Sequence, residues 1–183
     1  MKPTIIGVTI LLSVAVVSSA WLHAQSGGAL PVSGYNAARD VAGAHELPDP
    51  KMDYRVVFAV ANGAKERTDV NPMLPTVATY LNTLAKHGVP ADHRHLAVMF
   101  HQRSDDVDIV MSNEAYKARY GIDNPNIAII RSLREAGVDL RVCGQALSAR
   151  KIDPSQVNPD IQIDLWALTS LVNLQMKGYV RVG

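Results

Sequence analysis

The chain has 183 residues, a normal length for one domain with its own core, and carries 18 basic and 17 acidic residues. This near-neutral balance provides no electrostatic basis for binding nucleic acid or an anionic membrane. The short signatures of phosphate-binding loops, HExxH zinc hydrolases, CxxC redox sites and calcium loops are absent from the sequence.

The first segment, residues 1–24, is typical of a secretory signal peptide. A basic start at Lys2 precedes an almost unbroken apolar run over residues 5–17, and small residues follow up to Ala20. We expect cleavage after Ala20 or, as a second choice, after Ala24, and a periplasmic location. The alternative is an uncleaved N-terminal anchor, the only case in which we expect membrane contact; the domain lies outside the cytoplasm either way.

Residues 25–52 are rich in Gly, Ala, Ser and Pro and predict a flexible linker or an arm lying on the domain, which spans residues 53–183. In chain order the apolar periodicity and the Gly and Pro positions predict strand 55–60, helix 75–87, strand 95–100, helix 113–120, a helix from Pro125 to Gly137, strand 138–143, a helix from Gly144, strand 161–165, helix 169–176 and strand 179–182. This alternation predicts an α/β fold with a mostly parallel five-stranded sheet and helices on both faces.

Residues whose side chains could take part in binding or catalysis follow three of these strands. In parallel α/β sheets the functional crevice lies at the carboxyl ends of the strands, where the sequence places Asn62, His101 and Cys143. The loop that begins at Asn62 and runs to Pro75 is long and polar enough to cover a site.

Cys143 is the only cysteine, so the chain cannot form an internal disulfide. Gly144 and Gln145 follow it as the expected first turn of a helix, where free backbone N–H groups and the helix dipole stabilise a thiolate, the reactive form of cysteine. A structural cysteine that packs at a crowded strand end is an equally supported interpretation at this point.

His101 could deprotonate a thiol at a neighbouring strand end, although a surface histidine at the start of a loop is the simpler interpretation. His93 and His95 lack an obvious third ligand nearby in the sequence. We therefore predict no metal site and no cofactor.

Several segments together resemble the DsrE/DsrF-like family, specifically its exported single-domain branch. They are Tyr54–Phe58 with Asn62–Lys65, Asn124–Asn126, Val142–Leu147, and Leu168–Gln175 before Gly178. The resemblance extends over residues 54–182. It implies a YchN-like three-layer α/β sandwich and homo-oligomers, commonly trimers or hexamers.

The resemblance also implies a chemistry, because relatives carry sulfur as a persulfide on a cysteine in the position of Cys143, and many exported relatives have a histidine at the position of His101. Our leading hypothesis is a periplasmic sulfur carrier or sulfurtransferase in which Asn62, Gly144 and Gln145 help to bind anionic sulfur. The partners would be small sulfur species or a thiol-bearing protein. The alternatives are a binding module for a small ligand or a soft metal such as copper, and an oligomeric scaffold in which the cysteine only packs.

Overall fold

The computed structural model describes residues 29–101 and 105–183, so the predicted signal segment, residues 1–24, lies outside the described residues. The described residues form a five-stranded sheet in the order β4-β3-β2-β1-β5, and every neighbouring pair of strands is parallel. The strands are β1 (Tyr54–Val60), β2 (Arg94–Phe100), β3 (Asp139–Cys143), β4 (Gln162–Asp164) and β5 (Val180–Val182). The predicted five-stranded parallel α/β sheet is confirmed.

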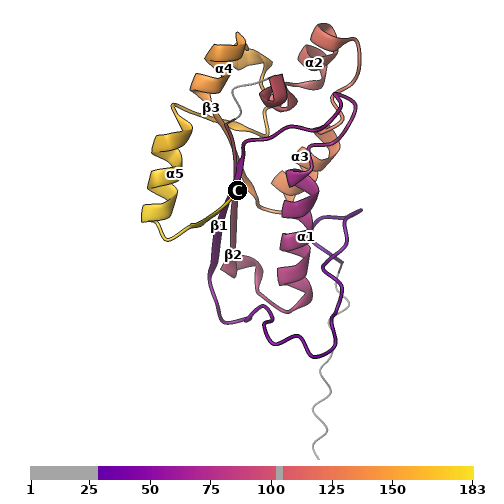
Figure 1. Cartoon of the computed structure of the whole chain (residues 1–183), viewed down its shortest axis with the longest axis vertical. Helices are drawn as coiled ribbons and strands as arrows, with labels where there is room; N and C mark the ends of the chain where they lie inside the picture. Colours follow the sequence, from indigo (N-terminus) through magenta and orange to yellow (C-terminus); the bar gives the residue numbers. More distant parts are fainter. Residues whose placement is uncertain (1–28, 102–104) are drawn as a thin grey trace, which may run out of the picture.

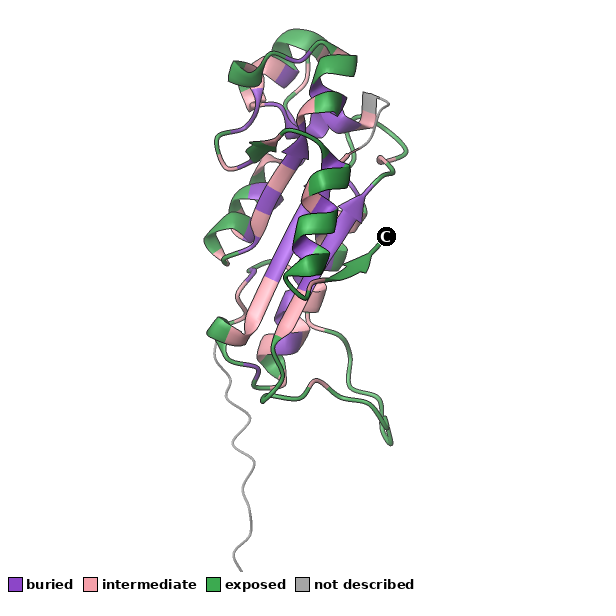
Figure 2. Ribbon diagram, turned by 90° about the vertical axis from the view of Figure 1, so that its left-hand side faces the viewer, coloured by how far each residue is buried: buried purple, intermediate pink, exposed green. Residues whose placement is uncertain are grey.

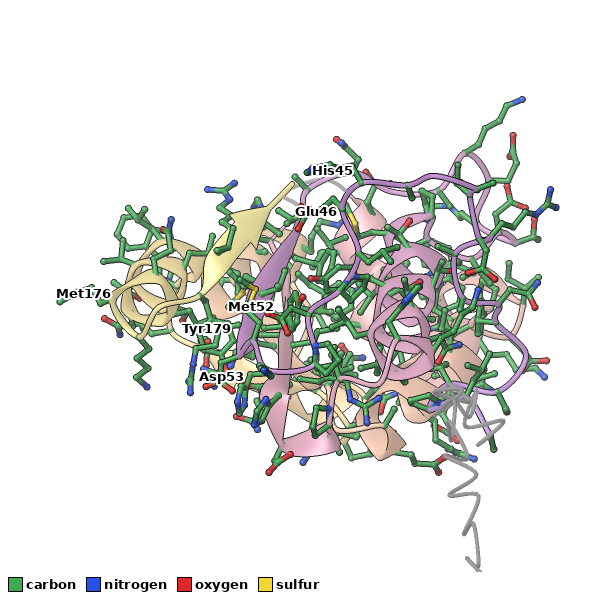
Figure 3. All side chains as sticks on the ribbon, turned by 90° about the horizontal axis from the view of Figure 1, so that it is seen from below. His45, Glu46, Met52, Asp53, Met176 and Tyr179 are labelled. Atoms are coloured by element: carbon green, nitrogen blue, oxygen red, sulfur yellow. The ribbon has the colours of Figure 1, made fainter. Side chains whose placement is uncertain are left out.

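Helices cover both faces of this sheet. They are α1 (Met73–Lys86), α2 (Asn113–Tyr120), α3 (Ile127–Glu135), α4 (Gly144–Arg150) and α5 (Ala167–Met176), with short 3-10 helices η1 (Ala91–His93), η2 (Asp105–Val110) and η3 (Pro154–Gln156). Figure 1 shows α1 and α3 on one side of the strands and α5 on the other, and Figure 3 shows the same three layers from below. No helix within the described ranges is both long and apolar enough to cross a lipid bilayer.

The two central strands are buried along most of their length. In β1 and β2 only the first two residues are partly exposed, and the remaining five of each strand are buried. Figure 2 shows this gradient, with buried strands toward the carboxyl ends and intermediate residues at the amino ends. The carboxyl ends of these two strands therefore lie in an environment from which much of the water is excluded.

Most element bounds differ from the sequence prediction by one or two residues, and the start of α3 has a specific cause. Pro125 does not begin the helix, because the residues on either side of it form a buried hydrogen-bonded turn. Asn126 N–H donates to the side-chain oxygen of Asn124 at 3.0 Å, and the Asn126 side-chain oxygen accepts from Asn71 N–H at 2.8 Å. The helix then begins at Ile127.

The N-terminal arm, here residues 29–53, has no helix or strand but is fastened to α1. Val32 is fully buried, and its backbone N–H and C=O both bond to the side-chain amide of Asn82 at 2.9 Å. The same amide donates to the Tyr35 carbonyl at 2.7 Å. A fully buried asparagine in α1 therefore holds the arm by saturating backbone groups that would otherwise be left unpaired.

Candidate functional site

Strand register brings His101 and Cys143 together. Phe100 on β2 pairs with Val142 on β3, so the next residues in register are His101 and Cys143. His101 N–H donates to the Val60 carbonyl at 3.2 Å and so continues the ladder one residue beyond β2. Because side chains alternate along strands and neighbouring strands lie about 4.8 Å apart, both side chains point to the same face as adjacent groups.

A pocket of about 280 Å³ lies at this position, between the carboxyl edge of the sheet and helices α4 and α5. His101, Cys143 and Arg181 line it from the sheet side, Gln145 and Ala146 line it from α4, and mostly apolar residues at the start of α5 complete the wall. The predicted thiol and imidazole therefore share one cavity.

The sulfur of Cys143 is held by a hydrogen bond from a neighbouring helix. Cys143 is 4% exposed, and Ala167 N–H, the first of α5, donates to its Sγ at 3.3 Å. The sequence predicts that the backbone N–H groups of Gly144 and Gln145 help to bind anionic sulfur, and the structure adds this N–H from α5. A backbone N–H directed at sulfur orients the thiol and stabilises negative charge that develops on it.

Glycine at position 144 permits this arrangement. A Cβ placed there would lie 3.0 Å from the Asp164 carbonyl oxygen and 3.3 Å from that of Leu165. The segment that leads from β4 into α5 therefore runs directly over the residue after Cys143. This close approach brings the first turn of α5 to the sulfur.

His101 is half-buried, and its Nε2 is buried with no hydrogen-bond partner among the described residues. Burial lowers the pKa of His101, and the positive charge of Arg181 lowers it further. The imidazole is therefore mainly neutral at pH 7 and can accept a proton.

The other predicted site residues occupy different positions. Gln145 lines the pocket, is exposed, and donates from Nε2 to the Leu165 carbonyl at 3.3 Å. Gly144 does not line the pocket, and neither does Asn62. Asn62 is an exposed residue beyond the end of β1, and its backbone carbonyl accepts from the Asn71 side chain at 2.9 Å.

The loop after Asn62 lines a separate polar hollow of about 240 Å³, which also includes Asp106, Ile109 and Tyr116. The loop therefore contributes to this second hollow and not to the wall of the Cys143 pocket.

The pocket walls include residues that sequence reasoning missed, namely Trp166, Leu168, Leu171 and Arg181. Arg181 pairs in register with Val57, because β5 lies beside β1 at the edge of the sheet. The alternation of residues in the last strand could have shown that Arg181 points to the opposite face of the sheet from Val180 and Val182. It could not have shown which strand β5 would pair with.

Asp108 in η2 is a buried carboxylate. It accepts hydrogen bonds from Arg119 at 2.9 Å, from Arg150 at 3.1 and 3.2 Å, and from the Tyr120 hydroxyl. Burial raises the pKa of Asp108, but the hydrogen bonds from Arg150, Tyr120 and Arg119 outweigh burial and hold the pKa below its ordinary value. This network joins η2, α2 and α4, the helix that directly follows Cys143.

His93 is the last residue of η1, and His95 is the second residue of β2. His95 Nε2 lies 3.7 Å from an Asp53 oxygen at the partly exposed amino end of the sheet. Within residues 29–101 and 105–183, no group of three or more His, Cys, Asp or Glu side chains is arranged to hold a metal ion.

Fold and site together define a parallel α/β protein with one thiol and one imidazole in the same pocket at the carboxyl edge of its sheet. A model of the DsrE/DsrF-like family matches residues 55–182. The chain belongs to the DsrE/DsrF-like family.

Among solved structures, the chain is similar to the protein of unknown function MTH1491 from Methanobacterium thermoautotrophicum. The identity is 19% and the TM-score 0.47, over 71% of this chain and 100% of that one. No curated protein sequence matches this chain significantly.

Proposed function

We propose that this chain carries sulfane sulfur as a persulfide on Cys143. One observation carries the proposal: the single thiol and the His101 imidazole line the same pocket at the carboxyl edge of the sheet. Membership in the DsrE/DsrF-like family supports a function related to sulfur relay. The site residues in this proposal are Cys143 as acceptor and His101 as proton-transfer group.

The transfer step needs no external oxidant. His101 takes the thiol proton, and the Cys143 thiolate attacks the outer sulfur of a persulfide donor, R–S–SH. The thiolate electron pair forms the new S–S bond on Cys143 while the donor S–S bond breaks, and its electron pair leaves on the inner sulfur. The proton of the outer sulfur passes to the departing thiolate, so the donor leaves as the thiol R–SH. Cys143 then holds the persulfide as an anion, and His101 keeps the proton that it took from the thiol.

Mass spectrometry of the intact protein tests this chemistry. After incubation with polysulfide or with a small organic persulfide, the protein should gain the mass of one sulfur atom, and the gain should disappear after reduction. Because the sequence contains one cysteine, the site of the adduct is unambiguous. Cys143→Ala should show no adduct, and His101→Gln should form it more slowly. A well-folded wild-type protein that never gains sulfur would refute the proposal.

A second candidate function is the binding of a small ligand or a soft metal at the same pocket, since a thiolate and an imidazole are both ligands for copper. The observation in its favour is that Cys143 and His101 face one cavity. Titration with Cu(I) under reducing conditions distinguishes it, because tight binding should be lost in both Cys143→Ser and His101→Ala. Binding that both variants retain would exclude this site.

We further propose that the chain is exported and acts in the periplasm as a member of the exported single-domain branch. The support is the sequence pattern of residues 1–24. Expression of the full chain followed by cell fractionation and N-terminal sequencing tests it. A mature N-terminus after Ala20 or Ala24 is expected, and full-length protein in the cytoplasm would contradict it.

We also propose that the chain forms a homo-oligomer through the outer face of α5. Val172 and Met176 lie four residues apart on that helix and are both exposed, and Figure 3 shows Met176 at the outer side of α5. Light scattering should give a mass above that of one chain for the wild type. Val172→Glu together with Met176→Glu should reduce that mass. A wild-type monomer would contradict the proposal.

A further inference from the structure

The Cys143 pocket has a chemical character that the persulfide proposal alone does not use. Its α5 wall is apolar, formed by Trp166, Leu168 and Leu171, and none of the described residues that line it is acidic. The volume of about 280 Å³ is just below the range of about 300–1,000 Å³ that is usual for ligand pockets. The cavity therefore suits a molecule of several non-hydrogen atoms with an apolar part.

Arg181 provides a positive charge at this pocket. It lies in register with Val57, and alternation along β1 and β2 places its side chain on the same face of the sheet as those of His101 and Cys143. Its Nε donates to the Gly183 carbonyl at 3.1 Å, which orients the guanidinium. Arg181 is exposed, so it forms a hydrated cationic edge of the pocket and can receive an anionic group.

The apolar wall continues to the surface. Trp166 is 40% exposed and Leu168 is 53% exposed, and both line the pocket. An apolar ligand segment that covers them would remove this surface from water, and each methylene buried there strengthens binding about fourfold. The apolar wall and the Arg181 guanidinium therefore line the same cavity as the buried thiol of Cys143.

We propose that this pocket selects a small organic anion with an apolar body, its carboxylate or sulfonate at Arg181 and its apolar part against Trp166, Leu168 and Leu171. This inference deepens the proposed function and rests on it for the reaction: the sulfur donor is a low-molecular-weight organic persulfide that carries such an anionic group. A bare inorganic sulfur anion would use the cation but leave the apolar wall uncovered.

Protection of Cys143 from alkylation tests the inference without any sulfur transfer. The rate of iodoacetamide labelling is measured by mass spectrometry in the presence of hexanoate, hexanamide or acetate. Hexanoate should protect at a concentration about fivefold below that of hexanamide, because only hexanoate can pair with the exposed arginine. It should protect far better than acetate, which lacks the apolar body. Equal protection by hexanoate and hexanamide would overturn the inference.

Variants assign each part of the preference to its residue. Arg181→Met should make hexanoate and hexanamide equivalent, whereas Arg181→Lys should retain a preference for hexanoate. Arg131→Met is a matched control, because Arg131 is an exposed arginine on α3 and does not line this pocket. Leu168→Asn should weaken the advantage of hexanoate over butanoate. Full retention of the hexanoate preference in a folded Arg181→Met protein would overturn the role of Arg181.

Calorimetric titration of the wild type and Arg181→Met with hexanoate and hexanamide makes the same comparison if the 4% exposed thiol reacts too slowly with iodoacetamide.

The persulfide function and the preference for an organic anion can fail separately. Selective hexanoate binding without any sulfur adduct refutes the persulfide function alone. Sulfur adducts that form equally well from charged and neutral organic persulfides refute the anion preference alone.

Discussion

Replacement of Asp108 by alanine should destabilise the protein more than any comparable change at a surface carboxylate. The Asp108 side chain is 1% exposed and accepts bonds from two guanidinium groups, whose arginine side chains are 27% and 31% exposed. Breaking a buried ion pair costs about 3–5 kcal/mol. Because water can reach both arginines after the substitution, we expect the lower end of that range, about 3 kcal/mol.

Urea unfolding followed by circular dichroism measures this cost. Asp123→Ala is the matched control, because Asp123 pairs with Lys117 at 3.1 Å and their side chains are 65% and 59% exposed. An exposed pair of this kind contributes at most about 1 kcal/mol. The slope of the transition should stay constant between variants, so that the midpoints report stability. A loss in Asp108→Ala no larger than that in the control would refute the reasoning.

The contribution of Asp108 should also depend on pH with a defined sign. Its hydrogen bonds hold the pKa below the ordinary value of 3.8, so the unfolded chain binds the proton more readily than the folded one. The stabilisation is therefore complete above the unfolded pKa and is lost as the pH falls through the folded pKa. The stability difference between wild type and Asp108→Ala should shrink in that acidic range.

Burial and a neighbouring guanidinium lower the pKa of His101, so the free energy of unfolding should fall as the pH drops below about 6.5. His101→Gln should lack this pH-dependent loss of stability. A pKa of the His101 ring measured by NMR at or above about 6.5 would contradict the prediction. Asn82→Ala leaves the backbone groups of buried Val32 unpaired and should cost about 2–3 kcal/mol, with faster proteolysis of the arm; unchanged proteolysis would count against it. Gly144→Ala places a Cβ 3.0 Å from the Asp164 carbonyl oxygen and should lower the free energy of unfolding, measured with urea, by about 1–3 kcal/mol. An unchanged midpoint would show that the segment between β4 and α5 moves away without cost.

The strands and most helices could be predicted because their signals are local. Apolar runs such as residues 95–100 and glycines after helices mark elements over a few neighbouring residues, and the structure places β2 at Arg94–Phe100. Parallel pairing then followed from the alternation of strands and helices. Parallel pairing alone predicts that His101 and Cys143 lie at the same edge of the sheet, whatever the register of the strands.

The rest of the site depends on contacts between distant segments. Asp108 could not be recognised as buried, because its arginine partners lie 11 and 42 residues further along the chain. Arg181 joins the pocket only because β5 lies beside β1 at the edge of the sheet. Sequence alternation could assign the face of such residues but not the neighbour that each strand would have.

The register of β2 against β3 makes the site sensitive to changes in chain length. Phe100 pairs with Val142, and the imidazole and thiol share a face only because they are the next residues on both strands. One residue inserted into either strand would turn one of the two groups toward the opposite helical layer. A substitution in these strands can therefore change the reactivity of the site gradually. A one-residue insertion or deletion in either strand should separate the imidazole from the thiol and so abolish the site.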